Sequence, residues 1–264
     1  MSTSDQFDWT SAKATDVDHQ YSPSQHSLRP IDEYLAEYHS LSIQHDAESL
    51  QIPNAPLLIY IHGGYWQRLS AADSLFNAND AITEGISLHA VEYTLAPHAS
   101  IAEIVAECIA DVISVIAELQ PTRVVLAGCS AGAHLAAMCA HNHEIAQHLS
   151  GLALLSGIYD LRPLVVTPTN DPLHLTNESA IELSPQLLPP IEQLPRALLA
   201  VGRAESAEFI RQNHEYADHL RIGRTQVETM VVEERDHFNL PYDLLKRGTL
   251  VGDWVLAQLL PEHS

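Results

Sequence analysis

Short apolar runs alternate with longer amphipathic stretches along most of the chain, and this alternation limits the possible folds more than any other feature. Between two of the runs, apolar residues recur at helical spacing on one face from Ile101 to Leu119. Alternating strands and helices favour a parallel sheet with right-handed crossovers. We therefore predict a three-layer α/β fold, with a mainly parallel sheet and helices on both faces, in one domain over residues 1–264. The six predicted strands are Leu57–Ile61, Ile86–Tyr93, Arg123–Ala127, Leu152–Leu155, Ala197–Val201 and Val227–Val232.

Two segments fall outside this alternation. Residues 1–30 are polar and without periodicity, which predicts an extended arm that covers another part of the protein. Residues 158–195 hold seven of the fifteen prolines and form a long insertion between two predicted strands, as a lid or pocket wall does; a surface excursion without function is the alternative. A short helix is predicted after Pro30, with one apolar face made by Ile31, Tyr34, Leu35, Tyr38, Leu41 and Ile43.

The charge balance excludes two classes of partner. The 264 residues include 34 Asp and Glu against 13 Lys and Arg, a formal net charge of −21. Such a surface repels phosphate backbones and anionic lipid, so neither nucleic acid nor a membrane is an expected partner. The same field disfavours strongly anionic substrates and suits a neutral or zwitterionic small molecule. No apolar stretch reaches the roughly 20 residues that span a bilayer.

The three cysteines, Cys108, Cys129 and Cys139, are too widely spaced for a disulfide framework or a cysteine zinc site. The polar, acidic N-terminus lacks the pattern of a signal peptide, and a cytoplasmic location is expected. Sixteen histidines raise the alternative of a metal hydrolase, with His141 and His143 as ligands. Alternate residues of a helix point about 200° apart, so these two cannot chelate together. We expect no metal and no cofactor.

The strongest local motif is Gly128-Cys129-Ser130-Ala131-Gly132, between a predicted strand and a predicted helix. A serine on such a tight turn is lifted out of the sheet, while the glycines let the helix pass closely. The amide of Ala131, at the start of the helix, then faces developing negative charge. The pattern predicts a nucleophilic serine; a glycine-flanked turn without function is the alternative.

A second glycine motif, His62-Gly63-Gly64-Tyr65-Trp66, follows the predicted strand Leu57–Ile61. Adjacent glycines let backbone N–H groups approach a ligand closely, as an oxyanion hole requires. Upstream of a nucleophile turn, this loop is the expected second half of that hole. We interpret His62 as a brace for the loop rather than as a catalytic residue.

A nucleophilic serine needs a base, and His237 is the histidine downstream of Ser130 that directly follows a predicted strand. Glu205, in the loop after Ala197–Val201, is the first candidate for the acid that orients it. Asp160 also follows a predicted strand and stays open as the alternative, while Glu208 and Asp236 are less favoured. The remaining downstream candidates are interpreted as surface or packing histidines: His134, His141, His143, His148, His174, His214 and His219.

These motifs, together with Tyr21-Ser22-Pro23-Ser24 and Glu205–Gln212, resemble the α/β-hydrolase esterases that include the kynurenine formamidases, or arylformamidases. The resemblance implies Ser130 as nucleophile, His237 as base, Glu205 as acid, and oxyanion donors at Gly63, Gly64 and Ala131. The family's acid is often aspartate, which keeps Asp160 under consideration. Cys129 replaces the more usual His or Tyr before the serine. The family's first strands are not recognisable between residues 40 and 56, which predicts a trimmed sheet.

The resemblance implies acyl transfer from a small ester or formamide, with N-formyl-kynurenine as the specific expectation and a general short-chain carboxylesterase as the alternative. A binding protein that keeps the fold without turnover is a more remote alternative. Aromatic residues in the strand-end loops are expected to face the substrate: Tyr65, Trp66, Tyr159 and Phe238. A homodimer is the candidate assembly.

Overall fold

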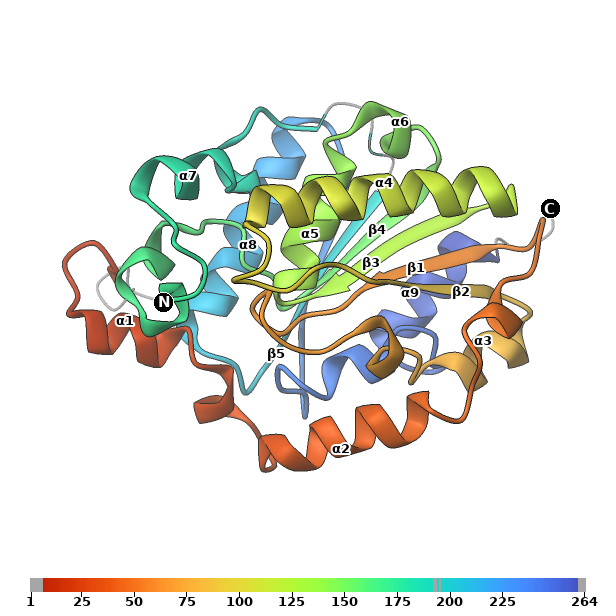
Figure 1. The fold of residues 1–264 in the computed structure, drawn as a ribbon, viewed down its shortest axis with the longest axis horizontal. Helices are drawn as coiled ribbons and strands as arrows, with labels where there is room; N and C mark the ends of the chain where they lie inside the picture. The colour runs from red at the N-terminus through yellow and green to blue at the C-terminus, as the bar shows by residue number, and fades with distance from the viewer. Residues whose placement is uncertain (1–6, 192–193, 195, 261–264) are drawn as a thin grey trace.

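The computed structural model describes residues 7–191, 194 and 196–260, and it contains the predicted parallel sheet (Figure 1). Six strands lie in the order β2-β1-β3-β4-β5-β6, and every neighbouring pair is parallel. All six predicted strands are confirmed; β1 has the predicted bounds, and the ends of the others shift by at most three residues. The strands are β1 (Leu57–Ile61), β2 (Ser87–Val91), β3 (Val124–Cys129), β4 (Leu149–Leu155), β5 (Arg196–Gly202) and β6 (Gln226–Val232).

Helices cover both faces of the sheet, as the alternation predicted. Helices α4, α5 and α8 pack on one face, and α3 and α9 pack on the other (Figure 1). No helix in the described part of the chain is long and apolar enough to cross a membrane. The described helices are α1 (Ala14–Gln20), α2 (Ile31–Ser42), α3 (Ala78–Glu84), α4 (Ile101–Leu119), α5 (Ala131–Ala140), α6 (His143–Ala146), α7 (Asn177–Glu182), α8 (Ala207–Ile222) and α9 (Leu250–Leu259).

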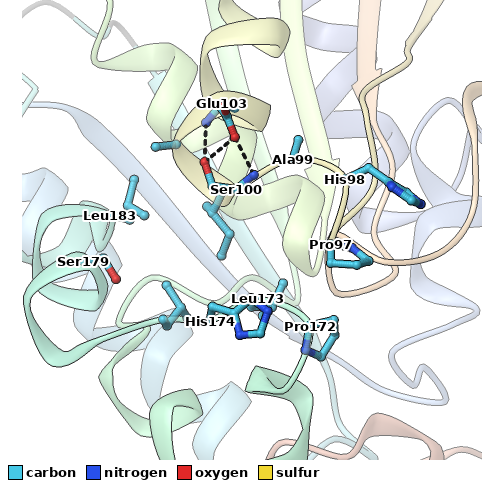
Figure 2. A pocket seen from close by; sticks show the side chains of 13 residues that line it. Pro97, His98, Ala99, Ser100, Glu103, Pro172, Leu173, His174, Ser179 and Leu183 are labelled. Atoms are coloured by element: carbon cyan, nitrogen blue, oxygen red, sulfur yellow. Dashed lines mark hydrogen bonds between the residues drawn. The ribbon is translucent and has the colours of Figure 1, made fainter.

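The insertion at 158–195 begins inside the core and then runs along its rim. Its first residues, including Tyr159, Leu161 and Leu164, are fully buried, and short helical turns and α7 follow. A cavity of about 390 Å³ lies between residues 172–183 of the insertion and the first turn of α4 (Figure 2). The end of the predicted insertion, at 192–193 and Pro195, lies outside the described residues.

The N-terminal segment differs from the extended arm that its composition suggested. It contains helix α1, which packs beside α8, and Val17 is its only fully buried side chain. Because α1 buries only Val17, its sequence shows no apolar periodicity. The prediction of an extended arm was therefore wrong over Ala14–Gln20. Residues 1–6 of the arm lie outside the described part. Helix α2 begins at Ile31 as predicted, but Ile43 lies just past its end and is exposed rather than on the packed face.

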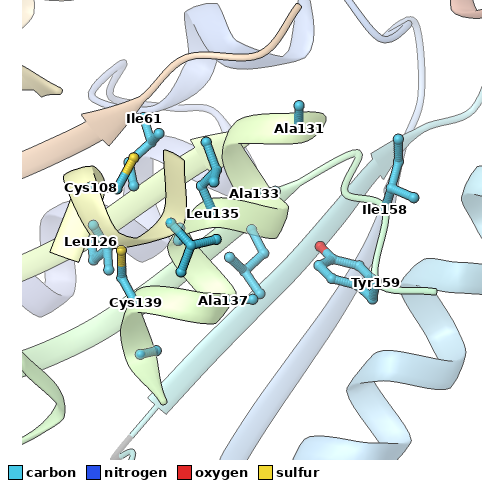
Figure 3. Packing of buried hydrophobic residues seen from close by; sticks show 14 of the residues in the cluster. Ile61, Cys108, Leu126, Ala131, Ala133, Leu135, Ala137, Cys139, Ile158 and Tyr159 are labelled. Carbon is cyan, nitrogen blue, oxygen red and sulfur yellow. The ribbon is translucent and has the colours of Figure 1, made fainter. Parts of the chain in front are cut away.

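Two hydrophobic cores flank the sheet, because consecutive residues of a strand point to opposite faces. In β1, Leu57, Ile59 and Ile61 enter the core under α4 and α5, while Leu58 and Tyr60 enter the other. Figure 3 shows the first core, where alanines of α5 and the thiols of Cys108 and Cys139 pack against the sheet. Small side chains let α5 approach the strands closely, which matters for the turn that precedes it.

The chain adds β2 on one side of β1 and then β3 to β6 on the other side, so the strand order reverses between β1 and β3. Chain crossovers run to opposite sides from this point, which leaves a crevice beyond the carboxyl ends of these strands. Ile61 at the end of β1 pairs in register with Gly128 near the end of β3. One glycine motif follows Ile61 and the other begins at Gly128, so the fold brings both motifs to one place.

Candidate active site

Ser130 lies on a sharp turn between β3 and α5. Its backbone has φ 59° and ψ −123°, a strained conformation for a residue with a side chain. Its N–H donates to the Leu155 carbonyl (2.9 Å), and its own carbonyl accepts from Ala133 and His134 in the first turn of α5. These bonds hold the strained turn, and α5 begins at Ala131 as predicted.

The two glycines of this motif are required by close backbone packing. A Cβ on Gly132 would lie 2.0 Å from the Ile61 carbonyl oxygen, and one on Gly128 would lie 2.2 Å from the Gly132 carbonyl oxygen. Neither position has room for a side chain. The glycines therefore let α5 start directly against the end of β1, and the serine is the residue that projects from this junction.

His237 and Glu205 form a buried pair. His237 Nδ1 lies 2.7 Å from Glu205 Oε2, and their side chains are 6% and 1% exposed. This bond occupies Nδ1 and leaves Nε2 as the nitrogen available to the serine. The Cys129 thiol, next to Ser130, donates to the His237 carbonyl oxygen (3.7 Å), so the histidine loop lies against the serine turn.

The Glu205 carboxylate has further donors on its other oxygen. Oε1 accepts from the Ser156 hydroxyl (2.6 Å) and from the Gly202 N–H (2.7 Å). The Ala204 N–H donates to the Arg235 carbonyl (3.1 Å), which ties this loop to the one that carries His237. Together these bonds fix the direction in which the carboxylate faces the imidazole.

The competing acids are engaged elsewhere. Asp160 forms a two-point ion pair with Arg162, at 2.9 and 2.8 Å. Glu208 binds Arg211 in the same way, at 2.7 and 2.8 Å, on helix α8. Of the carboxylates considered from the sequence, Glu205 is the one whose oxygen the structure places on the His237 imidazole.

The glycine loop after β1 lies directly beside Ser130. A Cβ on Gly63 would be 2.9 Å from the Cys129 carbonyl oxygen and 3.2 Å from Ser130 Cβ. Gly64 has φ +99°, a conformation that residues with a side chain rarely adopt. Gly63, in the loop after β1, and Ala131, the first residue of α5, therefore both lie next to Ser130.

His62 braces this loop, as interpreted from the sequence. Its imidazole, whose pKa is lowered by burial, hydrogen-bonds through Nδ1 to the Gly63 carbonyl (2.9 Å). The Tyr93 ring stacks on it, and the Tyr93 hydroxyl lies 3.2 Å from the same carbonyl oxygen. The C=O and the following N–H of a trans peptide point in opposite directions, so holding this carbonyl also sets the direction of the Gly64 N–H.

The four aromatic residues expected near the substrate have different surroundings. Trp66 is fully buried and contacts His134 edge to face, and Tyr159 is fully buried and stacks on Tyr216. Tyr65 and Phe238 keep some exposure, and each contacts the N-terminal segment through Tyr21 and Tyr34 respectively. A role for any of the four in substrate binding stays a prediction.

Other chemistry is sparse in the described residues. They contain no group of three or more His, Cys, Asp or Glu side chains able to hold a metal ion. His134 is buried next to the serine turn and its Nε2 lies 2.7 Å from the Leu183 carbonyl oxygen; burial lowers its pKa to about 4. Burial also raises the pKa of the Cys129 thiol well above its ordinary value, so the thiol stays protonated.

Three residues with clear roles in the geometry were not found from the sequence. Ser156 supports Glu205, Tyr93 supports the glycine loop, and Asp236 anchors the loop of His237. The signal available for the first was its position directly after a predicted strand, and Tyr93 ends a predicted strand. For Asp236 the only signal was its place beside the proposed base.

The strained serine turn, the glycine loop and the imidazole–carboxylate pair on a parallel sheet define a hydrolase-type site. A family model described as the alpha/beta hydrolase fold matches residues 58–240, and the chain belongs to this family.

The chain is also similar to named proteins over nearly its whole length. It is 31% identical to a kynurenine formamidase of Danio rerio, over 96% of this chain and 98% of that protein. It is 32% identical to a kynurenine formamidase of Salmo salar, over 96% and 97%. Among solved structures, a candidate thioesterase from Silicibacter sp. TM1040 superposes with a TM-score of 0.80 at 22% identity, covering 92% of this chain and 99% of that one. At that identity the structural likeness supports the fold alone.

Proposed function

We propose that this protein is a serine hydrolase that converts N-formyl-kynurenine and water to kynurenine and formate. The observation that carries the serine mechanism is the buried 2.7 Å bond between His237 and Glu205 beside the strained turn of Ser130. The substrate is inferred from the two fish relatives, which are named kynurenine formamidases and align with almost all of this chain.

The reaction begins with attack of the Ser130 hydroxyl oxygen on the formyl carbon, while His237 Nε2 accepts the hydroxyl proton. The tetrahedral intermediate collapses as the carbon–nitrogen bond breaks, and His237 returns the proton to the departing aromatic amine. Water then attacks the carbonyl carbon of the formyl ester on Ser130 while His237 Nε2 accepts a proton from that water. The bond from this carbon to the Ser130 oxygen breaks, His237 returns the proton to the Ser130 oxygen, and formic acid leaves and ionises to formate. Glu205 holds the imidazole in the tautomer with its proton on Nδ1 and stabilises the imidazolium.

The oxyanion of both tetrahedral intermediates is assigned to backbone donors. Gly63 lies beside Ser130 from one side and Gly64 follows it in the loop, while Ala131 is the first residue of α5 on the other side. The N-terminus of a helix favours negative charge. A single donor of this kind contributes roughly 2.7–4 kcal/mol to the transition state.

The closed environment of Ser130 suits a small acyl group. The serine is 3% exposed and His237 is 6% exposed. A formyl group needs little space, whereas the large amine side must extend away from the serine. The pocket-wall role of the insertion is proposed for residues 172–183, which border the cavity next to the first turn of α4. The buried, unpaired cysteines support a reducing, cytoplasmic location.

Two substrates measured side by side test this proposal. The wild-type protein is assayed on N-formyl-kynurenine and on p-nitrophenyl acetate, together with Ser130→Ala and with Ser40→Ala as an exposed-serine control. We expect Ser130→Ala to lose about 10⁴-fold or more in kcat on both substrates. A higher kcat/KM for the formamide supports the specific function. A higher kcat/KM for the ester would identify the protein as a general short-chain carboxylesterase. Full activity of Ser130→Ala would exclude the serine mechanism.

A further inference from the structure

The residue before the proposed base has an unusual set of hydrogen bonds. Asp236 is fully buried, and each of its carboxylate oxygens accepts two donors. Oδ1 accepts from the backbone N–H groups of Phe238 and Asn239, both at 2.9 Å. Oδ2 accepts from the Leu28 N–H at 2.6 Å and from the Tyr34 hydroxyl at 2.9 Å. One oxygen therefore shapes the loop of the histidine, and the other binds the N-terminal segment.

His237 is held from both sides by this arrangement. Asp236, the residue before His237 in the chain, accepts a hydrogen bond from the Tyr34 hydroxyl of α2. Phe238, the residue after His237 in the chain, stacks its ring on the Tyr34 ring with centroids 5.6 Å apart, and the Tyr38 hydroxyl donates to the Phe238 carbonyl. The two neighbours of the histidine in the chain are thus both attached to the same helix.

The Asp236 carboxylate is satisfied by these hydrogen-bond donors rather than by an ion pair. The adjacent Arg235 guanidinium pairs with Asp243 instead, at 2.8 and 3.0 Å. No ion pair involves Asp236 among residues 7–191, 194 and 196–260. A buried carboxylate without a cation is tolerated only when hydrogen bonds replace its hydration. Loss of one donor leaves a buried carboxylate oxygen with a single partner. We expect the loop to shift to recover a second one. Burial and this carboxylate raise the pKa of Tyr34 to about 12, so the hydroxyl remains a donor.

The same N-terminal segment also contacts the other two loops of the site. The Gln20 carbonyl accepts from the hydroxyl of Ser206 (2.6 Å), the residue after the proposed acid. The Tyr21 carbonyl accepts from the hydroxyl of Tyr65, the residue after the glycine pair. Each loop is therefore bound at a residue directly next to a functional one, and Asp236 supplies this link for the histidine.

We propose that Asp236 is a positioning residue, through which the N-terminal segment of residues 20–38 fixes the imidazole of His237 between Ser130 and Glu205. Asp236 does not touch the substrate; it acts through the peptide groups on either side of the base. This inference rests on the proposed function, because it assigns a role to a neighbour of the proposed base.

Tyr34→Phe tests the link from the N-terminal side. It removes one donor to Asp236 and keeps the stacked ring. Tyr242→Phe is the matched control, because the Tyr242 hydroxyl donates to the Glu37 carboxylate, also on α2, at 3.2 Å but does not contact the histidine loop. We expect kcat of Tyr34→Phe to fall about tenfold with KM little changed, because small misplacements of a catalytic group are costly. Wild-type kcat in folded Tyr34→Phe would overturn the proposal.

Asp236→Asn extends the test to the carboxylate itself. In either orientation, the side-chain amide of this variant points N–H groups at backbone N–H donors that need an acceptor. We therefore expect a larger loss of kcat for Asp236→Asn than for Tyr34→Phe. The two losses should not add in the double variant, because both break the same link. Independent, multiplying losses would mean that the two residues affect activity by separate routes and would contradict the proposal.

Proton NMR separates this inference from the proposed reaction. The proton between His237 Nδ1 and Glu205 gives a downfield resonance, identified by its loss in His237→Gln. We expect this resonance to broaden or shift in Tyr34→Phe and to keep its wild-type position in Tyr242→Phe. An unchanged resonance in Tyr34→Phe would overturn the positioning role. The signal reports the imidazole directly, so it answers the question even if Ser130→Ala retains activity and the serine mechanism fails.

Discussion

Glu205 and His237 lie 32 positions apart in the chain, yet Glu205 Oε2 and His237 Nδ1 are 2.7 Å apart, and both side chains are buried. The bond joins the loops after β5 and β6, and the Ser156 hydroxyl after β4 fixes the other carboxylate oxygen. Exclusion of water strengthens a hydrogen bond to a charged group. The pair is therefore held in one geometry before any substrate arrives.

Replacing the acid should remove most of the activity. In Glu205→Gln the side chain keeps its size but loses its charge and favours the wrong tautomer of His237. We expect kcat to fall by about 10⁴-fold, as for such changes in other serine hydrolases. Asp160→Asn, which breaks the Arg162 ion pair, should cost far less. Steady-state kinetics on one ester decide between them, and the reverse order of losses would assign the acid to Asp160.

Ser156→Ala should lower activity without removing a reacting group. It removes the Ser156 hydroxyl, which donates to Glu205 Oε1 at 2.6 Å, so that the Gly202 N–H is the remaining donor to this oxygen. We expect kcat to fall by about 10- to 100-fold, since a hydrogen bond to a charged group contributes about 1.5–3 kcal/mol. Ser87→Ala is the control: its buried hydroxyl hydrogen-bonds to backbone around residues 50–52, away from the site. Equal kcat values for the two variants would refute the role given to Ser156.

Gly132→Ala should destabilise the protein strongly. The new Cβ would lie 2.0 Å from the Ile61 carbonyl oxygen, so backbone atoms of α5 or β1 must move. We expect the free energy of unfolding to fall by about 3 kcal/mol or more. Gly85→Ala, where φ is +67° but no atom lies within 4 Å, should cost only about 1 kcal/mol. Urea titration compares them, and similar losses would mean that close packing is not what requires Gly132.

The buried His134 predicts a pH dependence of stability. Burial lowers its pKa from 6.5 to about 4, so the unfolded chain takes up a proton at a higher pH than the folded protein does. Stability is therefore complete above about pH 6.5 and falls as the pH drops towards about 4, by up to about 3 kcal/mol. His134→Gln keeps an N–H donor but does not titrate. Its urea unfolding curves should show a smaller decrease over this range; an identical decrease would exclude His134 as a source.

The fold was predictable because both faces of the sheet are buried. The central strands β1, β3 and β5 then appear as continuous apolar runs, and α4 shows its packed face over its whole length. The edge strands β2 and β6 are partly exposed and include polar residues. The exceptions have physical causes. Strand β4 starts at Leu149, before the predicted apolar run. The prediction missed this start because Ser150 and Gly151 are not apolar; in the structure, Trp254 and Gln258 of α9 fill the space above Gly151. Helix α1 has one buried anchor, Val17, and so no pattern to detect.

The candidate site was predictable where a residue stands in a local motif. The serine turn and the glycine loop are each encoded within five consecutive residues, and the backbone clash at Gly132 shows why. The contacts of Asp236 are not local. They join it to Leu28 and Tyr34, 208 and 202 positions away, and no spacing in the sequence reports such pairs. The choice of Glu205 over Asp160 also required the hydrogen bond to be seen, since both follow predicted strands.

Covalent labelling tests the central claim most directly. The protein is treated with a fluorophosphonate, the labelled peptide is mapped by mass spectrometry, and the remaining hydrolysis of N-formyl-kynurenine is measured at each extent of labelling. The account predicts one labelled residue, Ser130, and a loss of hydrolysis in direct proportion to the fraction labelled. Label on another residue, or hydrolysis that persists when Ser130 is fully labelled, would contradict it.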